Sequence, residues 1–146
     1  MKFLFACAWV LLTASPLWLS NFQSARQSAN EQHKLILLNF SGSDWCAPCI
    51  KMKAEVFESE SFSTIANKHL VLLRADFPRL KKNQLPAEQL TQNESLAEAY
   101  NPEGKFPLTV LLDANGKELK RWDGYVFASQ DKFLAELETT LNNQKP

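Results

Sequence analysis

Residues 44–49 read DWCAPC, in which two residues separate a pair of cysteines. The stretch before them, KLILLNF at residues 34–40, is a continuous apolar run rich in branched side chains. Such a run predicts a strand buried on both faces. The stretch after them predicts a helix that carries Ile50, Ala54 and Phe57 along one face. We therefore expect the cysteine pair at the turn where a buried strand leads into a helix.

The pair could bind a metal, staple the fold or carry out redox chemistry. A zinc site needs four ligands, and the other candidates, Cys7, His33 and His69, show no second paired spacing. Covalent haem attachment needs a histidine directly after the second cysteine, where this chain has Ile50. A disulfide across so short a loop stabilises by only about 2 kcal/mol, less than one that closes a longer loop. Metal binding and a purely structural disulfide stay open but less favoured, and we expect no metal and no cofactor.

Redox chemistry has a physical reason behind each residue of the motif. At the strand-to-helix turn, Cys46 lies at the N-terminus of the helix, where unpaired N–H groups and the helix dipole favour a thiolate. Such placement lowers the pKa of a cysteine thiol into a range of about 3.5 to 7.5. Pro48 lacks an N–H group and suits a first helical turn, so it holds the two sulfurs in one geometry. Cys49 can then attack a mixed disulfide formed on Cys46.

The rest of the chain predicts one α/β domain with a mixed central sheet. Helices that alternate with strands, followed by a hairpin, are typical of that class. A capping box of Ser20 and Gln23 is expected to begin the first helix, whose inward face carries Phe22, Ala25 and Ala29. In order, the expected elements are helix 21–32, strand 34–40, the helix after the cysteines, strand 69–76, helix 86–100, strands 109–112 and 118–122 around a turn at Asn115-Gly116, and a helix from near Ser129.

Length and charge narrow the classes of function. The chain has 146 residues, enough for one compact domain. Its 16 basic and 16 acidic side chains balance, so the charge indicates no nucleic-acid partner. We expect a monomer that binds no nucleic acid.

Residues 1–16 predict a secretory signal. Lys2 precedes an apolar run at residues 3–12, and small residues follow that run. A run of roughly ten fits the apolar part of a signal, whereas a membrane-spanning helix needs about twenty. Because no clean cleavage motif is present, an uncleaved anchor and, least favoured, an element of the core stay open. With a signal or an anchor, the domain at residues 17–146 is secreted or periplasmic.

Four features, in this order, resemble the thioredoxin family. They are DWCAPC after a buried strand, KFPLT at residues 105–109, the Asn-Gly hairpin, and WDGY at residues 122–125 before a final helix. The resemblance covers residues 18–142 and is strongest to small secreted thioredoxin-like proteins without a large helical insertion. It implies a three-layer fold, in which helices flank a mixed sheet, and thiol–disulfide exchange with protein disulfides as substrates.

The resemblance also implies roles for single residues. Cys46 would be the attacking thiol and Cys49 the resolving thiol. The family places a buried aspartate on the strand before the cysteines, but alignment of the strands puts Asn39 there, or Phe40 without a gap. Neither residue titrates, so proton transfer from Cys49 would use water or another group such as Asp76.

The same resemblance predicts a substrate groove. Pro107 matches the family's cis-proline, and the cis form is cheap only before proline. A trans proline before an edge strand is the alternative. Backbone beside this proline, at Phe106, is expected to pair with an extended substrate segment. Trp45 and Gly124 match positions that line the groove, where glycine permits close approach, although packing alone stays open for Trp45.

These expectations combine into an extracytoplasmic thiol–disulfide oxidoreductase. The dipeptide Ala47-Pro48 is closer to the Gly-Pro of reducing thioredoxins than to the His-containing pairs of strong oxidants. We therefore favour a reductase over an oxidant or isomerase. A reductase outside the cytoplasm needs electrons, which implies a membrane-embedded thiol carrier as donor. The alternative of another class is a non-catalytic binding module on the same scaffold, against which the intact cysteine pair argues.

Between Asp76 and Tyr100 the chain is longer than a minimal thioredoxin. This insert carries a basic cluster of Arg79, Lys81 and Lys82. A docking patch is one interpretation of the cluster, and a solvated loop is the one that the sequence favours.

Overall fold

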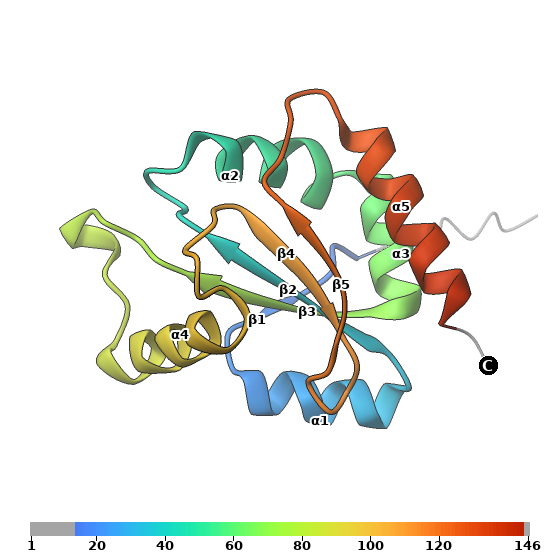
Figure 1. The fold of residues 1–146 in the computed structure, drawn as a ribbon, viewed down its shortest axis with the longest axis horizontal. Helices are drawn as coiled ribbons and strands as arrows, with labels where there is room; N and C mark the ends of the chain where they lie inside the picture. The colour runs from blue at the N-terminus through green and yellow to red at the C-terminus, as the bar shows by residue number, and fades with distance from the viewer. Residues whose placement is uncertain (1–13, 145–146) are drawn as a thin grey trace, which may run out of the picture.

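A computed structural model describes residues 14–144, in which a five-stranded mixed sheet carries helices on both faces (Figure 1). The strands are β1 (Trp18–Leu19), β2 (Leu35–Ser41), β3 (Leu70–Asp76), β4 (Leu108–Leu112) and β5 (Glu118–Asp123). Across the sheet they lie in the order β1-β3-β2-β4-β5. β3 is parallel to β1 and β2, whereas β4 is antiparallel to β2 and β5.

Two layers of helices enclose the sheet, as predicted. The helices are α1 (Phe22–Gln32), α2 (Ala47–Met52), α3 (Glu60–His69), α4 (Ala87–Tyr100) and α5 (Gln130–Asn143), with a π-helical turn η1 (Lys53–Phe57) after α2 and a 3₁₀ turn η2 (Lys81–Asn83) before α4. α1 and α4 pack on one face, and α2, α3 and α5 pack on the other (Figure 1). This arrangement confirms the expected α/β, three-layer, thioredoxin-like fold.

The strand predicted before the cysteines is the centre of the core. Successive side chains of a strand point to opposite faces. In β2, Leu38 and Phe40 pack against the layer of α1 and α4, while Leu37 packs against the layer of α2. All three are fully buried, which confirms that the strand is covered on both faces. The same alternation turns Asn39 toward the layer that carries the cysteines.

The first helix begins one residue later than predicted, with Asn21 instead of Ser20 as its N-cap. Asn21 has an extended backbone, and its side-chain oxygen accepts a hydrogen bond from the Ser24 N–H group at 2.8 Å. Asparagine is among the best N-cap residues, so it displaces the predicted capping box of Ser20 and Gln23. Ala25 and Ala29 are buried as expected.

The buried face predicted for the helix after the cysteines is wrong in part. Ile50 is 49% exposed and Ala54 is also exposed, although Phe57 is buried. Because the helix begins directly after Cys46, the positions that meet the sheet are Cys49 and Met52, followed by Val56 and Phe57. The predicted residues have helical spacing, but the face on which Ile50 and Ala54 lie is turned away from the core.

One α-helix and one strand were missed. A Ser59 cap, whose hydroxyl accepts the Phe62 N–H group at 3.2 Å, begins α3 as a helix separate from α2. Phe62 and Ile65 on α3 are buried in the same core as Phe57. The short strand β1 adds an edge to the sheet by pairing with β3.

The predicted signal falls largely outside the part of the chain that the structure describes, since that part begins at residue 14. From residue 14 to residue 144, no helix combines the length and the apolar character that crossing a membrane requires.

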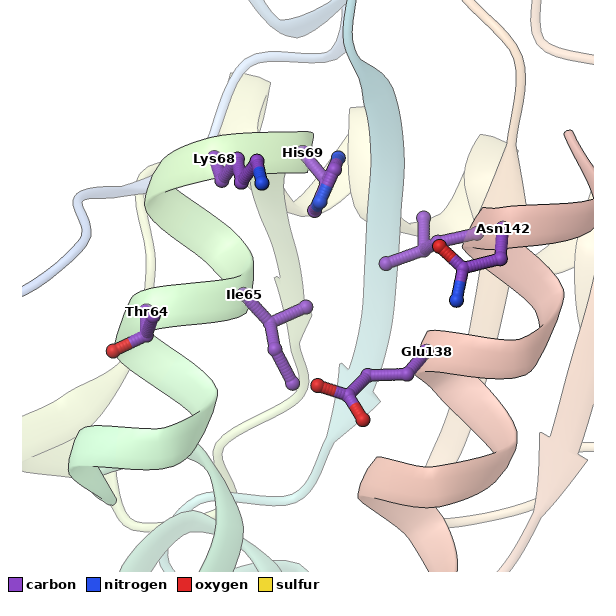
Figure 2. A pocket seen from close by; sticks show the side chains of 7 residues that line it. Thr64, Ile65, Lys68, His69, Glu138 and Asn142 are labelled. Atoms are coloured by element: carbon purple, nitrogen blue, oxygen red, sulfur yellow. The ribbon is translucent and has the colours of Figure 1, made fainter. Parts of the chain in front are cut away.

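A surface hollow of about 320 Å³ lies between α3 and α5 (Figure 2). It is lined by Thr64, Ile65, Lys68, His69, Glu138, Leu141 and Asn142. These residues adjoin the start of β3 at Leu70, whereas Asp76 at the other end of β3 contacts Ser43 beside the cysteines. The hollow is therefore at the opposite end of the sheet from the cysteine pair.

Candidate active site

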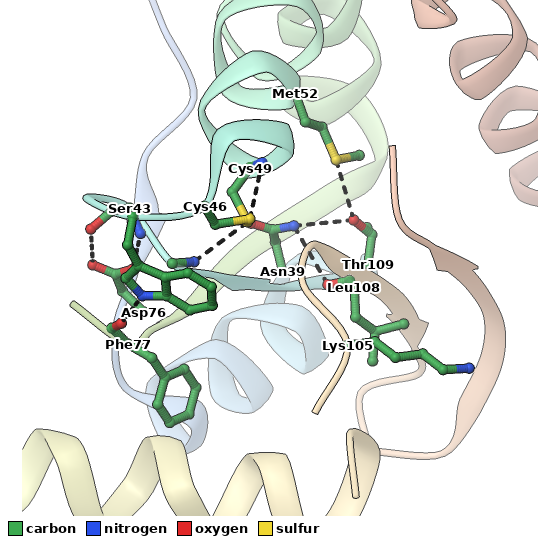
Figure 3. Close-up of a disulfide and its surroundings, with 12 residues drawn as sticks. Asn39, Ser43, Cys46, Cys49, Met52, Asp76, Phe77, Lys105, Leu108 and Thr109 are labelled. Carbon is green, nitrogen blue, oxygen red and sulfur yellow. Dashed lines mark hydrogen bonds between the residues drawn. A yellow bond between two sulfur atoms is a disulfide. The ribbon is translucent and has the colours of Figure 1, made fainter. Parts of the chain in front are cut away.

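Cys46 and Cys49 form a disulfide at the junction of the β2 segment with α2 (Figure 3). Their Cα atoms are 5.2 Å apart, and the two residues are only 5% and 4% exposed. Cys46 is the N-cap of α2, as the strand-to-helix position predicts. The Cys49 N–H group points to the Cys46 Sγ at 3.3 Å, and the Gly42 N–H group points to the Cys49 Sγ at 3.5 Å.

These contacts have a consequence for the reduced pair. The Cys49 N–H group is one of the backbone donors that a helix leaves unpaired at its N-terminus. A donor aimed at Sγ stabilises a thiolate more than a thiol, and the helix dipole acts in the same direction. The backbone alone therefore favours ionisation of Cys46 once the disulfide opens.

The predicted cis bond is present between Phe106 and Pro107. Pro107 is buried directly before β4, and its carbonyl oxygen accepts the Gly124 N–H group at 2.8 Å. Gly124 has φ +75°, a left-handed conformation that glycine adopts without strain. The next residue, Leu108, pairs with Phe40 near the end of β2, so the proline segment lies at the cysteine end of the sheet.

The indole of Trp45 is held from three sides. Its Nε1–H donates to the Phe77 carbonyl oxygen at 2.7 Å, and its ring meets the edge of Phe106 with 5.4 Å between centroids. The Arg79 guanidinium lies 3.7 Å from the indole centroid, a cation–π contact. A side chain at Gly42 would overlap the ring. Trp45 and Phe106, both predicted to line the substrate groove, thus lie in contact. Trp45 packs against its neighbours and is also partly exposed.

A buried asparagine occupies the strand position where the resemblance predicts an acid. Asn39 is 2% exposed, and its Nδ2 donates to the Thr109 Oγ1 at 3.1 Å (Figure 3). The Thr109 hydroxyl in turn lies 3.9 Å from the Met52 Sδ on α2. Asp76, the suggested substitute, has its carboxylate engaged by the N–H and hydroxyl groups of Ser43. Within residues 14–144, no ionisable side chain hydrogen-bonds to either cysteine sulfur.

A family model for a thioredoxin-like domain matches residues 22–141. The chain belongs to the thioredoxin-like family. Disulfide bond reductase DsbH of Chlamydia pneumoniae is 39% identical to it over 110 residues, which are 75% of this chain and 64% of DsbH. Thioredoxin-related protein DsbJ of the same organism is 28% identical over 107 residues, 73% of this chain and 30% of DsbJ. The chain thus spans less than two thirds of the length of each of these relatives.

Solved structures agree with this assignment. A DsbH oxidoreductase superposes with a TM-score of 0.75 at 33% identity, over 88% of this chain and 86% of the other. A thioredoxin from Thermus thermophilus reaches a TM-score of 0.65 at 21% identity, over 86% and 87% of the two chains, which supports the fold alone. The thioredoxin-like family and fold predicted from the sequence are confirmed.

One feature of this thioredoxin-like site has no counterpart among the predictions. The carboxylate of Asp44, the first residue of DWCAPC, accepts the N–H groups of Arg79 and Leu80 at 2.9 and 3.0 Å, and the Asn83 Nδ2 at 3.0 Å. The Arg79 N–H group, followed by Asn83, lowers the pKa of Asp44. The sequence offers only a weak signal for this role, an aspartate in a turn. The insert after β3 is therefore attached to the active-site turn.

Proposed function

We propose that this chain is a thiol–disulfide oxidoreductase that reduces protein disulfides outside the cytoplasm. The observation that carries the proposal is the Cys46–Cys49 disulfide at the start of α2, with backbone N–H groups aimed at both sulfurs. A pair that exists to staple the fold has no need of a helix N-terminus that favours one thiolate. Membership of the thioredoxin-like family and homology to a protein named disulfide bond reductase support the same conclusion.

The reaction begins with the reduced pair. The Cys46 thiolate attacks one sulfur of the substrate disulfide, forms a mixed disulfide and releases the other substrate sulfur as a thiolate, which takes a proton from water. Cys49 then loses its proton and attacks the Cys46 Sγ, which breaks the mixed disulfide and releases the second substrate thiol. The substrate gains two electrons and the cysteine pair loses two. Because Asn39 cannot accept the proton of Cys49, we propose that water takes it.

The proposed substrate groove runs along the Phe106–Pro107 segment. The β2–β4 ladder ends at the pair Phe40 and Leu108, so the backbone of Phe106 lies beyond it. An extended substrate segment can pair with such free backbone as an added strand. Trp45 contacts this segment through the Phe106 ring, and Gly124 contacts it through the hydrogen bond to the Pro107 carbonyl oxygen.

Location and electron supply belong to the same proposal. The apolar run at residues 3–12 supports export by a signal or retention by an anchor. We infer a secreted or periplasmic domain at residues 17–146 that acts as a monomer. After each turnover the oxidised pair needs two electrons, for which we propose a membrane-embedded thiol carrier.

The reduction potential of the purified protein tests the direction. Trp45 fluorescence in glutathione and dithiothreitol buffers reports the change, with Trp45→Phe as the control for signals from the other tryptophans. A value near or below about −230 mV supports a reductase, and a value near or above about −180 mV indicates an oxidant or isomerase. Cys49→Ser should accumulate mixed disulfides through Cys46. A protein with no reversible transition and no trapped substrate would instead be a binding module.

A further inference from the structure

The insert after β3 forms one wall of the active-site turn. The three residues before Cys46 each make a hydrogen bond to the insert or to the end of β3. Ser43 donates to the Asp76 carboxylate, and Trp45 donates to the Phe77 carbonyl oxygen. The Asp44 carboxylate accepts the N–H groups of Arg79 and Leu80. These contacts join segments that lie more than thirty positions apart in the sequence. The wall therefore has a defined position relative to the cysteines, unlike a solvated loop.

This wall carries a basic rim, which consists of Arg79, Lys81 and Lys82. All three side chains are exposed. In the region from residue 14 to residue 144, none of the ion pairs includes a member of the rim. The nearby carboxylate of Asp44 is committed to backbone and amide donors, and that of Asp76 is committed to Ser43. The rim thus has positive charge that no described side chain neutralises by an ion pair.

Arg79 brings part of this charge to the substrate groove. Its guanidinium lies 3.7 Å from the centroid of Trp45, whose ring meets Phe106 beside the cis bond. A guanidinium that lies over an aromatic ring keeps N–H groups that can bind a carboxylate in a forked geometry. The 3₁₀ turn η2 (Lys81–Asn83), tied to Asp44 by Asn83, places two lysines next to it.

We propose that the basic rim selects protein disulfides that are flanked by acidic residues. This inference rests on the proposed disulfide reductase activity and names its substrate class. A carboxylate a few residues from the attacked cysteine meets Arg79 as the substrate segment lies along Phe106, with Lys81 and Lys82 attracting further acidic side chains. Charged groups at the rim of an interface act mainly on the rate of association and on its salt dependence.

Two disulfide peptides of equal length provide the test, one with aspartates around its cysteines and one with asparagines at the same positions. The rate at which the reduced protein reduces each peptide is divided by the rate with dithiothreitol, whose attacking thiolate has the same charge as that of Cys46 and so corrects for the intrinsic reactivity of each peptide. We expect the acidic peptide to be about three- to tenfold faster at low salt, as befits a few partly exposed ion pairs. The ratio of the acidic to the neutral rate should fall toward one at high salt.

Substitutions in the rim assign the preference to these residues. Arg79→Gln, and separately Lys81→Gln with Lys82→Gln, should each lower the ratio of acidic to neutral rates. The second variant leaves the contact of Arg79 with Trp45 in place, so it keeps the test valid if Arg79 also supports the position of Trp45. Lys68→Gln with Lys117→Gln removes the same charge far from the groove and should preserve the ratio.

The outcomes are distinguishable. Equal rates for the two peptides, or a preference that survives both rim variants, would overturn the inference while the reductase proposal stands. Failure of the protein to reduce either peptide would overturn the proposed function together with the inference.

Discussion

The side-chain amide of Asn39 donates a hydrogen bond to the hydroxyl of Thr109, 3.1 Å away, in the buried layer between β2, β4 and α2. This pair occupies the place where the resemblance to thioredoxins predicts a buried acid. Both side chains are neutral, so no charge is buried there, and the hydrogen bond between them satisfies a buried donor and a buried acceptor. We expect this to favour stability over fast proton transfer from Cys49.

Asn39→Asp tests whether this position exchanges a faster proton transfer for greater stability. A carboxylate buried there loses the donor that Thr109 accepts, so the free energy of unfolding of the oxidised protein should fall by about 1–3 kcal/mol at neutral pH. The new group can also accept the proton of Cys49, so the resolving step should become faster near neutral pH. Denaturant unfolding and single-turnover release of a substrate thiol measure the two effects. Asn39→Leu, which has neither donor nor base, should not accelerate resolution; an equal acceleration there would contradict the proton-transfer explanation.

Asp44→Ala should release the insert from the active-site turn. Without the carboxylate, the N–H groups of Arg79 and Leu80 lose their acceptor, so trypsin should cleave after Arg79, Lys81 and Lys82 sooner than in the parent protein. The lowered pKa of Asp44 means that its contribution is present above the ordinary carboxyl pKa and disappears as pH falls through the lowered value. The protection of the backbone amides in residues 77–84 against hydrogen exchange, taken relative to the intrinsic exchange rate at each pH, should therefore fall under acid in the parent but change less in Asp44→Ala. Unchanged cleavage would show that other contacts hold the insert.

Hydrogen bonds to the Glu55 carboxylate hold the loop before α5, and one of them should be lost at high pH when Tyr125 ionises. The Tyr125 hydroxyl donates to the Glu55 Oε2 at 2.6 Å, and the Ala128 N–H group donates to the same oxygen at 3.2 Å. Burial, followed by the Glu55 hydrogen bond, raises the pKa of Tyr125 from 10.0 to about 12. A raised folded-state pKa gives stability that is complete below about 10 and is lost as pH rises toward 12.

Tyr125→Phe checks this linkage. At neutral pH it should lower the free energy of unfolding by about 1 kcal/mol, the usual value of one hydrogen bond. The difference from the parent protein should shrink between pH 10 and pH 12, where the parent loses the same contact. Glu55→Gln provides the matched control, because it removes the carboxylate that helps to raise the pKa of Tyr125 but keeps an oxygen that can accept the hydrogen bond from its hydroxyl. A constant difference across this pH range would contradict the role of Glu55.

Gly42→Ala should displace the indole of Trp45. A Cβ atom there would overlap the ring, so the ring must move or the backbone must shift, at a cost of about 1–3 kcal/mol. The redox-dependent fluorescence of Trp45 should change, together with the rate of substrate reduction. Gly104→Ala is the comparison: its φ of +66° costs roughly 1–2 kcal/mol, but nothing lies within 4 Å of the added atom. Equal effects of the two variants on fluorescence would rule out the steric explanation.

Local patterns in the sequence were sufficient for most of the fold. The apolar run before the cysteines, the Asn-Gly turn and the apolar spacing after Ser129 predicted β2, the β4–β5 hairpin and α5 to within one or two residues. Burial periodicity and turn chemistry act over a few residues, so they can be recognised without knowledge of the chain's path. The rotation of α2 was missed for the same reason, because only contact with the sheet decides which helical face is buried.

The sequence by itself determined the chemistry of this protein: a cysteine pair at a strand-to-helix turn, an asparagine where an acid was expected, and a proline that can adopt the cis form. The tertiary structure alone decided what surrounds that chemistry. Asp44 meets Arg79 thirty-five positions away, and Arg79 covers Trp45, because the insert returns to the turn after β3. Such contacts depend on where the sheet brings distant segments together, and no local preference of either residue encodes them.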